Sequence, residues 1–233
     1  MTDKQKYWAV IPAAGVGKRM QADRPKQYLE LHGRTVLEHT LSRFLEHPLI
    51  SGVVVAVTDG DPYWQDLRIS HPKLFTASGG KERCHSVLNA LQVLQLQADD
   101  DDWVLVHDAA RPCLRNEDLD HLIEALKDHP IGGLLGLPVA DTMKRTAGDD
   151  TVLETVPREH LWRALTPQMF RLGDLYQALD TALRNNQLVT DDASAMELAG
   201  KAPKMVEGHG DNIKITRPQD LMLAELYLAQ QDV

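Results

Sequence analysis

Short apolar runs alternate with segments of helical periodicity between residues 8 and 138, and this alternation most restricts the fold of the chain. The runs expected to form strands cover residues 8–12, 52–58, 74–77, 103–108 and 132–138. Most are continuous in Val, Leu, Ile and Ala, as in a parallel sheet that is covered on both faces. The pattern predicts an α/β fold with a Rossmann-like, mostly parallel twisted sheet and helices on both faces.

Four helices are expected between and after these strands. The first begins at a capping box formed by Thr35 and Glu38 and ends before Pro48. The other three cover residues 86–97, 116–129 and 221–228, and the helix at 86–97 includes Leu96 in its apolar stripe. We expect the last of them to follow a capped start at residues 216–219.

Residues 139–160 interrupt the βα pattern. Two β-rich runs, 142–146 and 151–156, are joined by a tight Gly/Asp turn, which predicts a β-hairpin. Because an isolated two-stranded hairpin is marginally stable in water, we expect this one to pack on another surface, and a second subunit is the natural candidate. The chain is therefore expected to form a single domain, residues 1–233, with 139–160 as a dimerisation arm.

The loop after the first strand gathers glycines and basic side chains, in the stretches PAAGVGKRM (12–20) and PKQ (25–27), although the whole chain has a formal charge of −9. Glycine lets backbone N–H groups approach an anion, and Arg19 and Lys26 add mobile positive charge, so the loop predicts a polyphosphate ligand. Arg19 stands where a Walker A loop needs Ser or Thr, and Met20 stands where a dinucleotide fingerprint needs its third glycine. A solvated basic loop is the structural alternative.

Other candidates follow later strands. The stretch HDAARP (107–112) places Asp108 and Arg111 at the carboxyl edge of the sheet, where Asp108 could hold a ribose hydroxyl or a metal and Arg111 a phosphate. A structural ion pair between the two is the alternative. Gly79 and Gly80, before the helix containing Ser86, permit close approach of a nucleobase, which is weak evidence alone.

Single charges give less information. Lys214 lies in a short polar segment, 211–216, that is expected to be strand-like, and by themselves Lys214 and Arg158 indicate only solvated charges. The ten histidines show no metal-ligand pattern and are expected mostly at the surface. There is also no Gly-x-Ser-x-Gly elbow to indicate a hydrolase.

Composition limits the partners of the chain. The acidic charge balance argues against a general nucleic-acid binder. No apolar run approaches the roughly 20 residues that a membrane span needs, and the first six residues lack the apolar stretch of a secretory signal. The two cysteines, Cys84 and Cys113, have no metal-ligand spacing. Such cysteine usage favours the reducing cytoplasm.

Taken in order, these motifs resemble those of the 2-C-methyl-D-erythritol 4-phosphate cytidylyltransferases of the non-mevalonate isoprenoid pathway. The matching stretches are 12–20, 25–27, 79–80 with Arg83 and 86–87, 107–112, 138–144, 165–168, 190–194 and 211–214. The resemblance implies one nucleotidyltransferase domain, residues 1–233, that transfers CMP from CTP to 2-C-methyl-D-erythritol 4-phosphate. The products would be 4-diphosphocytidyl-2-C-methyl-D-erythritol and pyrophosphate, with Mg²⁺ ligated largely by the CTP phosphates and no metal ligand assigned to the protein.

By position in the family motifs, the resemblance also implies residue roles. Arg19 and Lys26 would stabilise the transition state at the α-phosphate, and Arg158 and Lys214 would hold the acceptor. Further acceptor contacts would be Asp108, Arg111, Thr142 and Thr166. The nucleotide would be framed by Ala13, Ala14, Gly15, Gly80, Ser86 and Asp108. The arm would cross to a second subunit, so that Arg158 and Thr166 complete the neighbouring site of a homodimer.

Two alternatives stay open at this point. A cytidylyltransferase for another sugar-alcohol phosphate, such as ribitol 5-phosphate, would share the fold and the nucleotide loop. A nucleotide-binding regulator without catalysis would not need Arg19, Lys26, Arg158 and Lys214 together. Lys81 departs from those relatives that carry an acidic residue beside the second glycine, which puts a side-chain contact to the nucleotide there in doubt.

Overall fold

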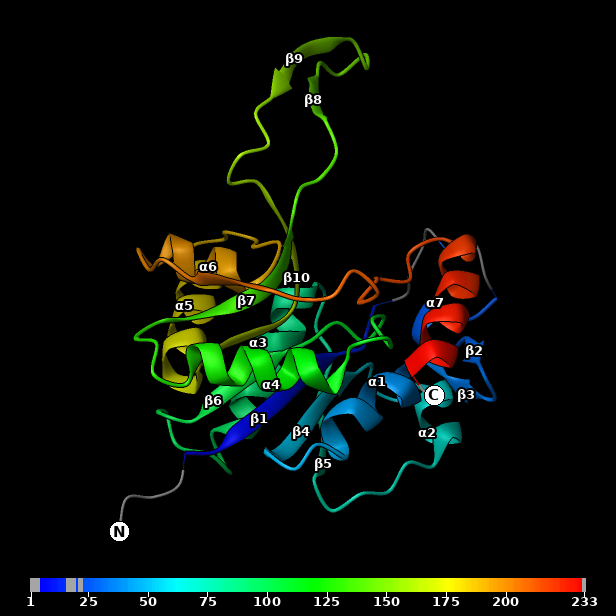
Figure 1. The fold of residues 1–233 in the computed structure, drawn as a ribbon. Helices are drawn as coiled ribbons and strands as arrows, with labels where there is room; N and C mark the ends of the chain where they lie inside the picture. Colours follow the sequence, from blue (N-terminus) through cyan, green and yellow to red (C-terminus); the bar gives the residue numbers. More distant parts are fainter. Residues whose placement is uncertain (1–4, 16–19, 21–22, 232–233) are drawn as a thin grey trace.

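A seven-stranded sheet forms the centre of the computed structural model, which describes residues 5–15, 20 and 23–231 (Figure 1). The strand order is β11-β7-β10-β6-β1-β4-β5. The strands are β1 (Tyr7–Pro12), β4 (Ile50–Val57), β5 (Leu74–Ser78), β6 (Trp103–Val106), β7 (Gly132–Pro138), β10 (Trp162–Arg171) and β11 (Lys204–Glu207). Only β10 is antiparallel to its neighbours in this sheet. The predicted α/β fold with a mostly parallel sheet is confirmed.

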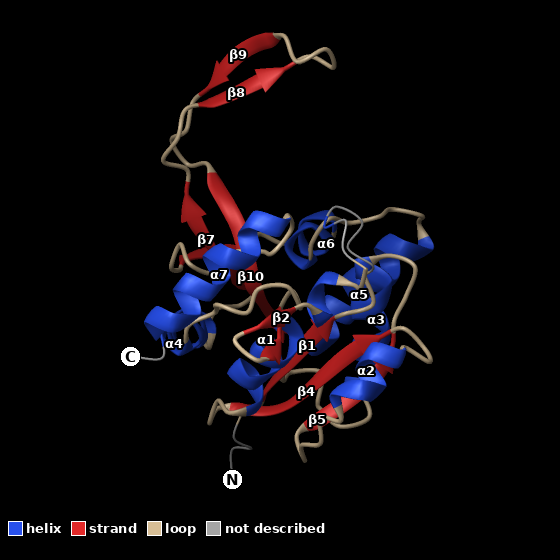
Figure 2. Cartoon of the chain, turned by 90° about the vertical axis from the view of Figure 1, so that its right-hand side faces the viewer, coloured by secondary structure: helices blue, strands red, loops and turns tan. Residues whose placement is uncertain are grey.

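Helices cover both faces of this sheet (Figures 1 and 2). On one face α1 (Val36–Leu45) and α4 (Asn116–Leu126) contribute to one buried cluster. On the other face α3 (Arg83–Leu94), α5 (Leu172–Arg184) and α6 (Asp192–Leu198) contribute to a second cluster. Each central strand is thus shielded from water on both sides, which explains why its sequence is apolar without alternation.

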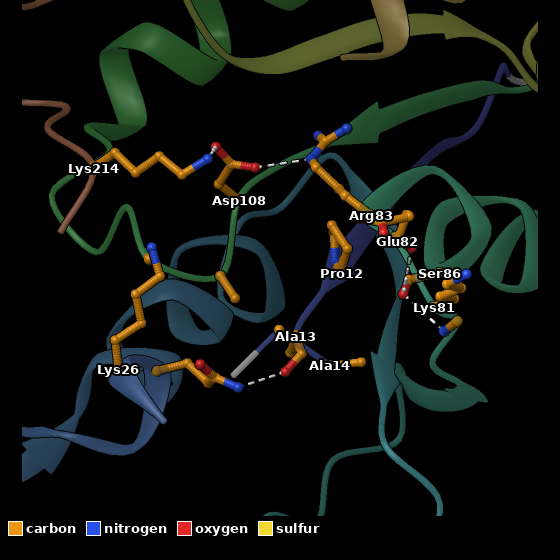
Figure 3. Close-up of a pocket in the computed structure, with 15 residues that line it drawn as sticks. Pro12, Ala13, Ala14, Lys26, Lys81, Glu82, Arg83, Ser86, Asp108 and Lys214 are labelled. Carbon is orange, nitrogen blue, oxygen red and sulfur yellow. Dashed lines mark hydrogen bonds and ion pairs between the residues drawn. The ribbon is translucent and has the colours of Figure 1, made fainter. Parts of the chain in front are cut away.

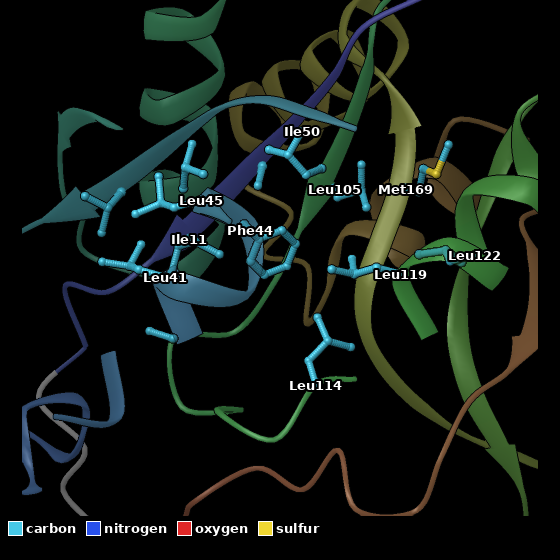
Figure 4. Close-up of a cluster of buried hydrophobic side chains, with 14 of the residues drawn as sticks. Ile11, Leu41, Phe44, Leu45, Ile50, Leu105, Leu114, Leu119, Leu122 and Met169 are labelled. Carbon is cyan, nitrogen blue, oxygen red and sulfur yellow. The ribbon is translucent and has the colours of Figure 1, made fainter. Parts of the chain in front are cut away.

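Residues of one strand divide between the two clusters. In β1, Ile11 belongs to the cluster with Leu41 and Phe44 of α1 (Figure 4). Val10 belongs instead to the cluster with Leu91 of α3. This division follows from the period of two in a strand, in which successive side chains point to opposite faces. Such a strand has one stable register, since a shift by one residue would exchange its faces.

A third, smaller cluster lies beside the sheet, where α7 (Pro218–Gln231) packs on the loops that follow β1 and β6. It includes Met20, Ala110, Ile215, Ala224 and Leu228. Close by are two very short paired strands, β2 (Glu30–Leu31) and β3 (Arg34–Thr35). The cluster therefore holds Met20, which lies in the predicted phosphate loop, and Leu31, which follows it.

The predicted hairpin is confirmed as β8 (Met143–Thr146) paired with β9 (Val152–Val156). It projects from the end of β7 and the start of β10 as a long arm, away from the rest of the molecule (Figures 1 and 2). Among its exposed side chains are Met143, Val152 and Leu153. The arm therefore presents apolar surface that its own chain leaves accessible to water.

Several elements lie outside the sequence-based expectations. They are the central strand β10, the edge strand β11, the helices α5 and α6, the short helix α2 (Pro62–Leu67), the 3₁₀ turn η2 (Lys26–Tyr28) and the β2–β3 pair. The β10 run contains Pro167, and a proline argues against a central strand because it lacks an N–H donor. In the structure, Pro167 falls where the pairing with β7 shifts register, between Ala164 and Gln168.

Three local expectations are wrong. Leu96 lies beyond α3 and is 79% exposed, because the helix ends at Leu94. Residues 211–216 belong to no strand. At the start of α7 the Thr216 side chain does not cap the helix; instead the Asp220 carboxylate accepts from the backbone N–H groups of Thr216 and Arg217. Within the described residues, no helix has the length and apolar character to cross a membrane.

Candidate active site

The carboxyl ends of β1, β5 and β6 open into a cavity of about 480 Å³ (Figure 3). Its walls come from four segments that are far apart in the sequence: the loops that follow β1, β5 and β6, and the segment before α7. The residues that line it are Pro12, Ala13, Ala14, Gly15, Lys26, Gln27, Gly80, Lys81, Glu82, Arg83, Ser86, Asp108, Ala109, Ala110 and Lys214. The predicted nucleotide-framing residues are thus brought together in one place. Open α/β sheets bind their ligands at this edge.

The first wall is the backbone that continues β1. The Ala13 N–H donates to the Ala56 carbonyl at 2.8 Å, and the buried Gln27 side chain donates to the Ala13 carbonyl at 2.6 Å. A Cβ atom placed on Gly15 would meet no described atom within 4 Å. The absence of a side chain at Gly15 therefore leaves space in the cavity rather than relieving a clash. Arg19, the other charged candidate of this loop, lies outside the described residues.

The second wall is the turn between β5 and α3. The Gly80 N–H donates to the Ser86 hydroxyl at 2.9 Å, so Ser86 holds the turn from inside the helix. A Cβ atom on Gly79 would collide with Ala14, and one on Gly80 would collide with His85. The two glycines are required by packing between these walls, in addition to any approach of a nucleobase.

Asp108 contacts three positively charged side chains, and these four residues form the charged junction of the site. Its carboxylate lies 2.9 Å from Lys214 Nζ, 3.0 Å from Arg83 Nε and 3.4 Å from Arg111 Nε. Burial alone raises the pKa of Asp108, but the nearby charges of Arg83, Lys214 and Arg111 outweigh it and hold the pKa well below its usual range. Asp108 is therefore an ionised acceptor at neutral pH. The predicted Asp108–Arg111 pair exists, although it is the longest of the three contacts.

The sequence motifs assign no role to Arg83, which occurs only within a stretch that matches the family. In the structure Arg83 lies between two buried carboxylates of the site. Its Nε donates to Asp108 and its terminal nitrogen lies 2.8 Å from the fully buried Asp192. In Figure 3, Arg83 and Lys214 approach Asp108 from opposite sides. No sequence signal connected Arg83 with Asp192, because α6 was not expected.

Lys26 faces this junction from η2. Its Nζ donates to the Ile215 carbonyl at 2.7 Å, next to Lys214 in the chain. The two predicted catalytic lysines, Lys26 and Lys214, therefore line one cavity although nearly the whole chain separates them. Positive side chains so placed attract the phosphates of a ligand.

A smaller cavity of about 240 Å³ adjoins the first and shares Arg83, Asp108 and Lys214 with it. Its other lining residues are Arg111, Ala164, Leu165, Thr166, Gln168, Thr190 and Asp191. Thr166 is buried here, and its hydroxyl accepts from the Asp108 backbone N–H at 3.2 Å. The expectation that Thr166 completes the site of a neighbouring subunit is therefore wrong, since the side chain is enclosed within its own chain. Thr166 stays a candidate acceptor contact in this cavity.

His107 also departs from expectation, because it is fully buried rather than at the surface. The Arg111 carbonyl, 3.0 Å from Nε2, can only accept, so the neutral imidazole carries its proton on Nε2. Nδ1 then accepts from the Thr166 hydroxyl at 3.0 Å. Burial lowers the pKa of His107 to about 4, so it is neutral and supports the loop that carries Asp108 and Arg111. His47 is likewise buried.

Thr142 and Arg158 line neither cavity. Both are exposed at the base of the arm, where an Arg158 guanidinium nitrogen donates to the Ala140 carbonyl. The structure of one chain therefore does not bring these two candidates to the other site residues.

Comparisons with known proteins agree with this geometry. The family model described as 2-C-methyl-D-erythritol 4-phosphate cytidylyltransferase matches residues 7–230. A Pseudomonas putida (strain GB-1) protein of that name is 60% identical over 217 residues, covering 92% of each chain. One from Vibrio vulnificus (strain CMCP6) is 54% identical over 224 residues, covering 96% of this chain and 94% of the relative.

Solved structures show the same likeness. The crystal structure of the Francisella tularensis 2-C-methyl-D-erythritol 4-phosphate cytidylyltransferase superposes with a TM-score of 0.84 at 39% identity, covering 96% of this chain and all of that one. A crystal structure of a 4-diphosphocytidyl-2C-methyl-D-erythritol synthase gives a TM-score of 0.84 at 38% identity, with 97% and 100% coverage. Each of the two likenesses therefore extends over nearly the whole of both chains.

Proposed function

This chain belongs to the 2-C-methyl-D-erythritol 4-phosphate cytidylyltransferase family, and we propose how its residues divide the transfer of CMP from CTP to 2-C-methyl-D-erythritol 4-phosphate. The reaction releases pyrophosphate and yields 4-diphosphocytidyl-2-C-methyl-D-erythritol, a step of isoprenoid biosynthesis. The observation that carries the proposal is the meeting of two cavities at Asp108 and Lys214. CTP would occupy the larger cavity and the sugar phosphate the smaller one.

The larger cavity suits the nucleotide. Ala13, Ala14, Gly15, Gly80 and Ser86 present mainly backbone and small side chains to it, which fits a flat base and a ribose. Lys26, with Arg19 from the same loop, would contact the α-phosphate and the leaving pyrophosphate. Negative charge grows on these oxygens during the transfer, so fixed cations stabilise the transition state more than the ground state.

The smaller cavity suits the phosphate of the acceptor. Lys214 and Arg111 line it and supply positive charge, while the Thr166 hydroxyl, whose proton goes to His107, could accept from a hydroxyl of the sugar. A phosphate monoester is already ionised at neutral pH, so the nucleophilic oxygen needs positioning and charge compensation rather than a general base. It would attack the α-phosphorus of CTP in line, forming the new P–O bond as the bond to pyrophosphate breaks.

Asp108 would have two roles. Its carboxylate holds Lys214 in the absence of substrate, and it can accept from a sugar hydroxyl once Lys214 turns toward a phosphate. Arg83 and Arg111 remain beside Asp108 at that stage and keep it ionised. The carboxylate thus stays an acceptor throughout the reaction.

Mg²⁺ is proposed as an ion carried by the triphosphate. Among the described residues, no three His, Cys, Asp or Glu side chains are grouped closely enough to hold a metal. Asp108 is already engaged by three cations. Mg²⁺ commonly keeps several waters and binds through substrate phosphates, so the phosphate oxygens of CTP would be its main ligands. When bound there, Mg²⁺ neutralises phosphate charge and so supports the approach of two anions.

The arm is proposed to form a homodimer. Its exposed apolar side chains, and the separation of Thr142 and Arg158 from the cavities of their own chain, support a model in which they serve a partner's acceptor site. Residues 1–233 would then be one nucleotidyltransferase domain, with 139–160 as the dimerisation arm. A cytoplasmic location is proposed from the two free, buried cysteines, Cys84 and Cys113.

The test is a pyrophosphate-release assay with CTP, Mg²⁺ and either 2-C-methyl-D-erythritol 4-phosphate or ribitol 5-phosphate. We expect release with the methylerythritol phosphate and little with ribitol phosphate. The reverse preference would assign the acceptor to ribitol phosphate, and no release with either would refute the proposal. Light scattering of the same preparation measures whether the protein is a dimer.

A further inference from the structure

Lys214 lies in an irregular segment, residues 208–217, that connects β11 to α7. A lysine side chain on irregular backbone has considerable conformational freedom, and holding it in one place costs entropy. Nevertheless its ammonium lies 2.9 Å from Asp108. Something else in the segment must therefore place its backbone.

Asn212 anchors this segment. The residue is 1% exposed, and its Nδ2 donates to the Thr166 carbonyl at 2.7 Å. Its own carbonyl accepts from the Arg111 guanidinium, also at 2.7 Å. Asn212 is thus tied to two residues of the smaller cavity, only two positions before Lys214.

These bonds close a ring. The Asp108 N–H donates to the Thr166 hydroxyl, the Thr166 carbonyl accepts from Asn212, and Lys214 returns to the Asp108 carboxylate. Arg111 crosses the ring, because it contacts both the Asp108 carboxylate and the Asn212 carbonyl. The position of Lys214 relative to Thr166 is therefore set by Asn212.

The side-chain oxygen of Asn212 shows what the amide contributes. Oδ1 is buried and finds no hydrogen-bond partner among the described residues. Leaving a buried acceptor unsatisfied destabilises the folded state, and an apolar side chain of similar size would avoid this cost. The contribution of asparagine at this position is thus its donor bond to Thr166.

We propose that Asn212 is a positioning residue that sets Lys214 against Thr166 and so determines affinity for the acceptor phosphate. The proposal rests on the acceptor-binding role proposed above for Lys214. Asn212 touches neither the nucleotide nor the acceptor in this arrangement, since it lines neither cavity. It acts through the backbone that it holds.

The part of this segment next to Lys26, which is proposed to contact the nucleotide, is held by Ile215. The Ile215 N–H donates to the Ala110 carbonyl at 2.8 Å, and its fully buried side chain packs in the cluster beneath α7. The Ile215 carbonyl accepts from Lys26. Loss of the Asn212 hydrogen bond therefore leaves the contacts of Ile215 with Ala110 and Lys26 in place. We expect the loss to weaken binding of the sugar phosphate and to leave binding of CTP largely unchanged.

The experiment compares KM values for the two substrates in Asn212→Leu. This substitution preserves approximate size, removes the donor and removes the unsatisfied oxygen. We expect the KM for the sugar phosphate to rise about tenfold, the value of one hydrogen bond of about 1.4 kcal/mol, with the KM for CTP within about threefold of the unsubstituted protein. Should Asn212→Leu fail to fold, Asn212→Ser provides the same comparison, because its short hydroxyl cannot span the distance to Thr166.

Asp211→Asn is the matched control. Asp211 is similarly buried but is held by Arg115 and Gln231, which line neither cavity. We expect it to lower thermal stability without changing the KM for the sugar phosphate. Equal changes in both KM values for Asn212→Leu, or the same acceptor effect in Asp211→Asn, would overturn the positioning role.

Lys214→Met, measured in parallel, tests the acceptor-binding role of Lys214 separately from the positioning role of Asn212. If Lys214→Met leaves the KM for the sugar phosphate unchanged, the proposed role of Lys214 fails and the inference falls with it. If Lys214→Met raises that KM and Asn212→Leu does not, Lys214 keeps its role and only the inference about Asn212 is refuted.

Discussion

The ammonium of Lys214 lies 2.9 Å from the carboxylate of Asp108, at the boundary between the two cavities of the site. Asp108 follows β6 in the centre of the sheet, whereas Lys214 precedes the last helix. A phosphate that enters the smaller cavity must compete with Asp108 for Lys214. In the reaction proposed above, binding of the sugar phosphate would therefore be coupled to an exchange of partners at Lys214, while Arg83 and Arg111 continue to compensate Asp108.

Replacement of Lys26 by alanine should slow catalysis without unfolding the protein. The lysine lines the larger cavity, where charge develops on phosphate oxygens, so we expect turnover to fall by about 10²–10³-fold. The measurement is pyrophosphate release at saturating substrates, with circular dichroism to confirm the fold. Lys127→Ala, which removes a surface lysine far from the cavities, is the control. Near-normal turnover in Lys26→Ala would remove Lys26 from the mechanism.

Arg158→Ala should impair use of the sugar phosphate much more than use of CTP. If the arm serves the partner, co-expression with Lys26→Ala should restore activity, because each mixed dimer then contains one site with both residues intact. With random pairing, about a quarter of the sites would be functional. If Arg158 acts in its own chain, no site in the mixture is intact. The absence of restored activity would therefore contradict a shared site.

Stability should depend on pH through His107. Its pKa is about 4 in the folded protein, against 6.5 for an exposed histidine, so below pH 6.5 the unfolded chain binds a proton that the folded chain does not. The free energy of unfolding should thus fall as the pH falls, by about 2 kcal/mol from this group between pH 7 and pH 5. Well above pH 6.5, where His107 is neutral in both the folded and the unfolded chain, it contributes no pH dependence. Urea unfolding at several pH values measures the slope.

His107→Gln tests the assignment. The substitution should flatten that part of the pH dependence, leaving the contribution of other buried histidines such as His47, whose pKa is also lowered by burial. Asp108 acts in a different range, because its pKa is held below the ordinary value and it is ionised in both states near pH 5. An unchanged slope in His107→Gln would show that His107 is not the titrating group.

Gly15 and Gly80 should respond differently to alanine. A Cβ at Gly80 would meet backbone atoms of His85, including the carbonyl carbon at 2.9 Å, so Gly80→Ala should distort the turn and lower thermal stability. A Cβ at Gly15 meets no described atom within 4 Å, so Gly15→Ala should leave the melting temperature unchanged. Because Gly15 lines the larger cavity, its methyl group should still raise the KM for CTP. Unchanged CTP affinity would place the nucleotide away from Gly15.

Much of the fold could be predicted from local pattern. The strands that became β1, β4, β5, β6 and β7 were expected to within a few residues, because their apolar runs report burial on both faces. The capping box at Thr35 begins α1 as expected. In contrast, β10 was missed because Pro167 signals a break, and its partners β6 and β7 tolerate that break only through a shift of register.

The site residues likewise fall into those that local sequence could predict and those that it could not. Local sequence was enough to locate the glycines and the positive charges, since the phosphate loop and the Gly79–Gly80 turn depend on neighbouring residues. Only long-range packing could show that the Thr166 side chain is enclosed within its own chain, that Arg83 joins Asp192 to Asp108, and that His107 is buried. The physical reason is that a short segment specifies its own backbone conformation, whereas side-chain partners and pKa values depend on which distant strands become neighbours. The Asp108–Lys214 pair forms only when β6 and the segment before α7 reach the same edge of the sheet.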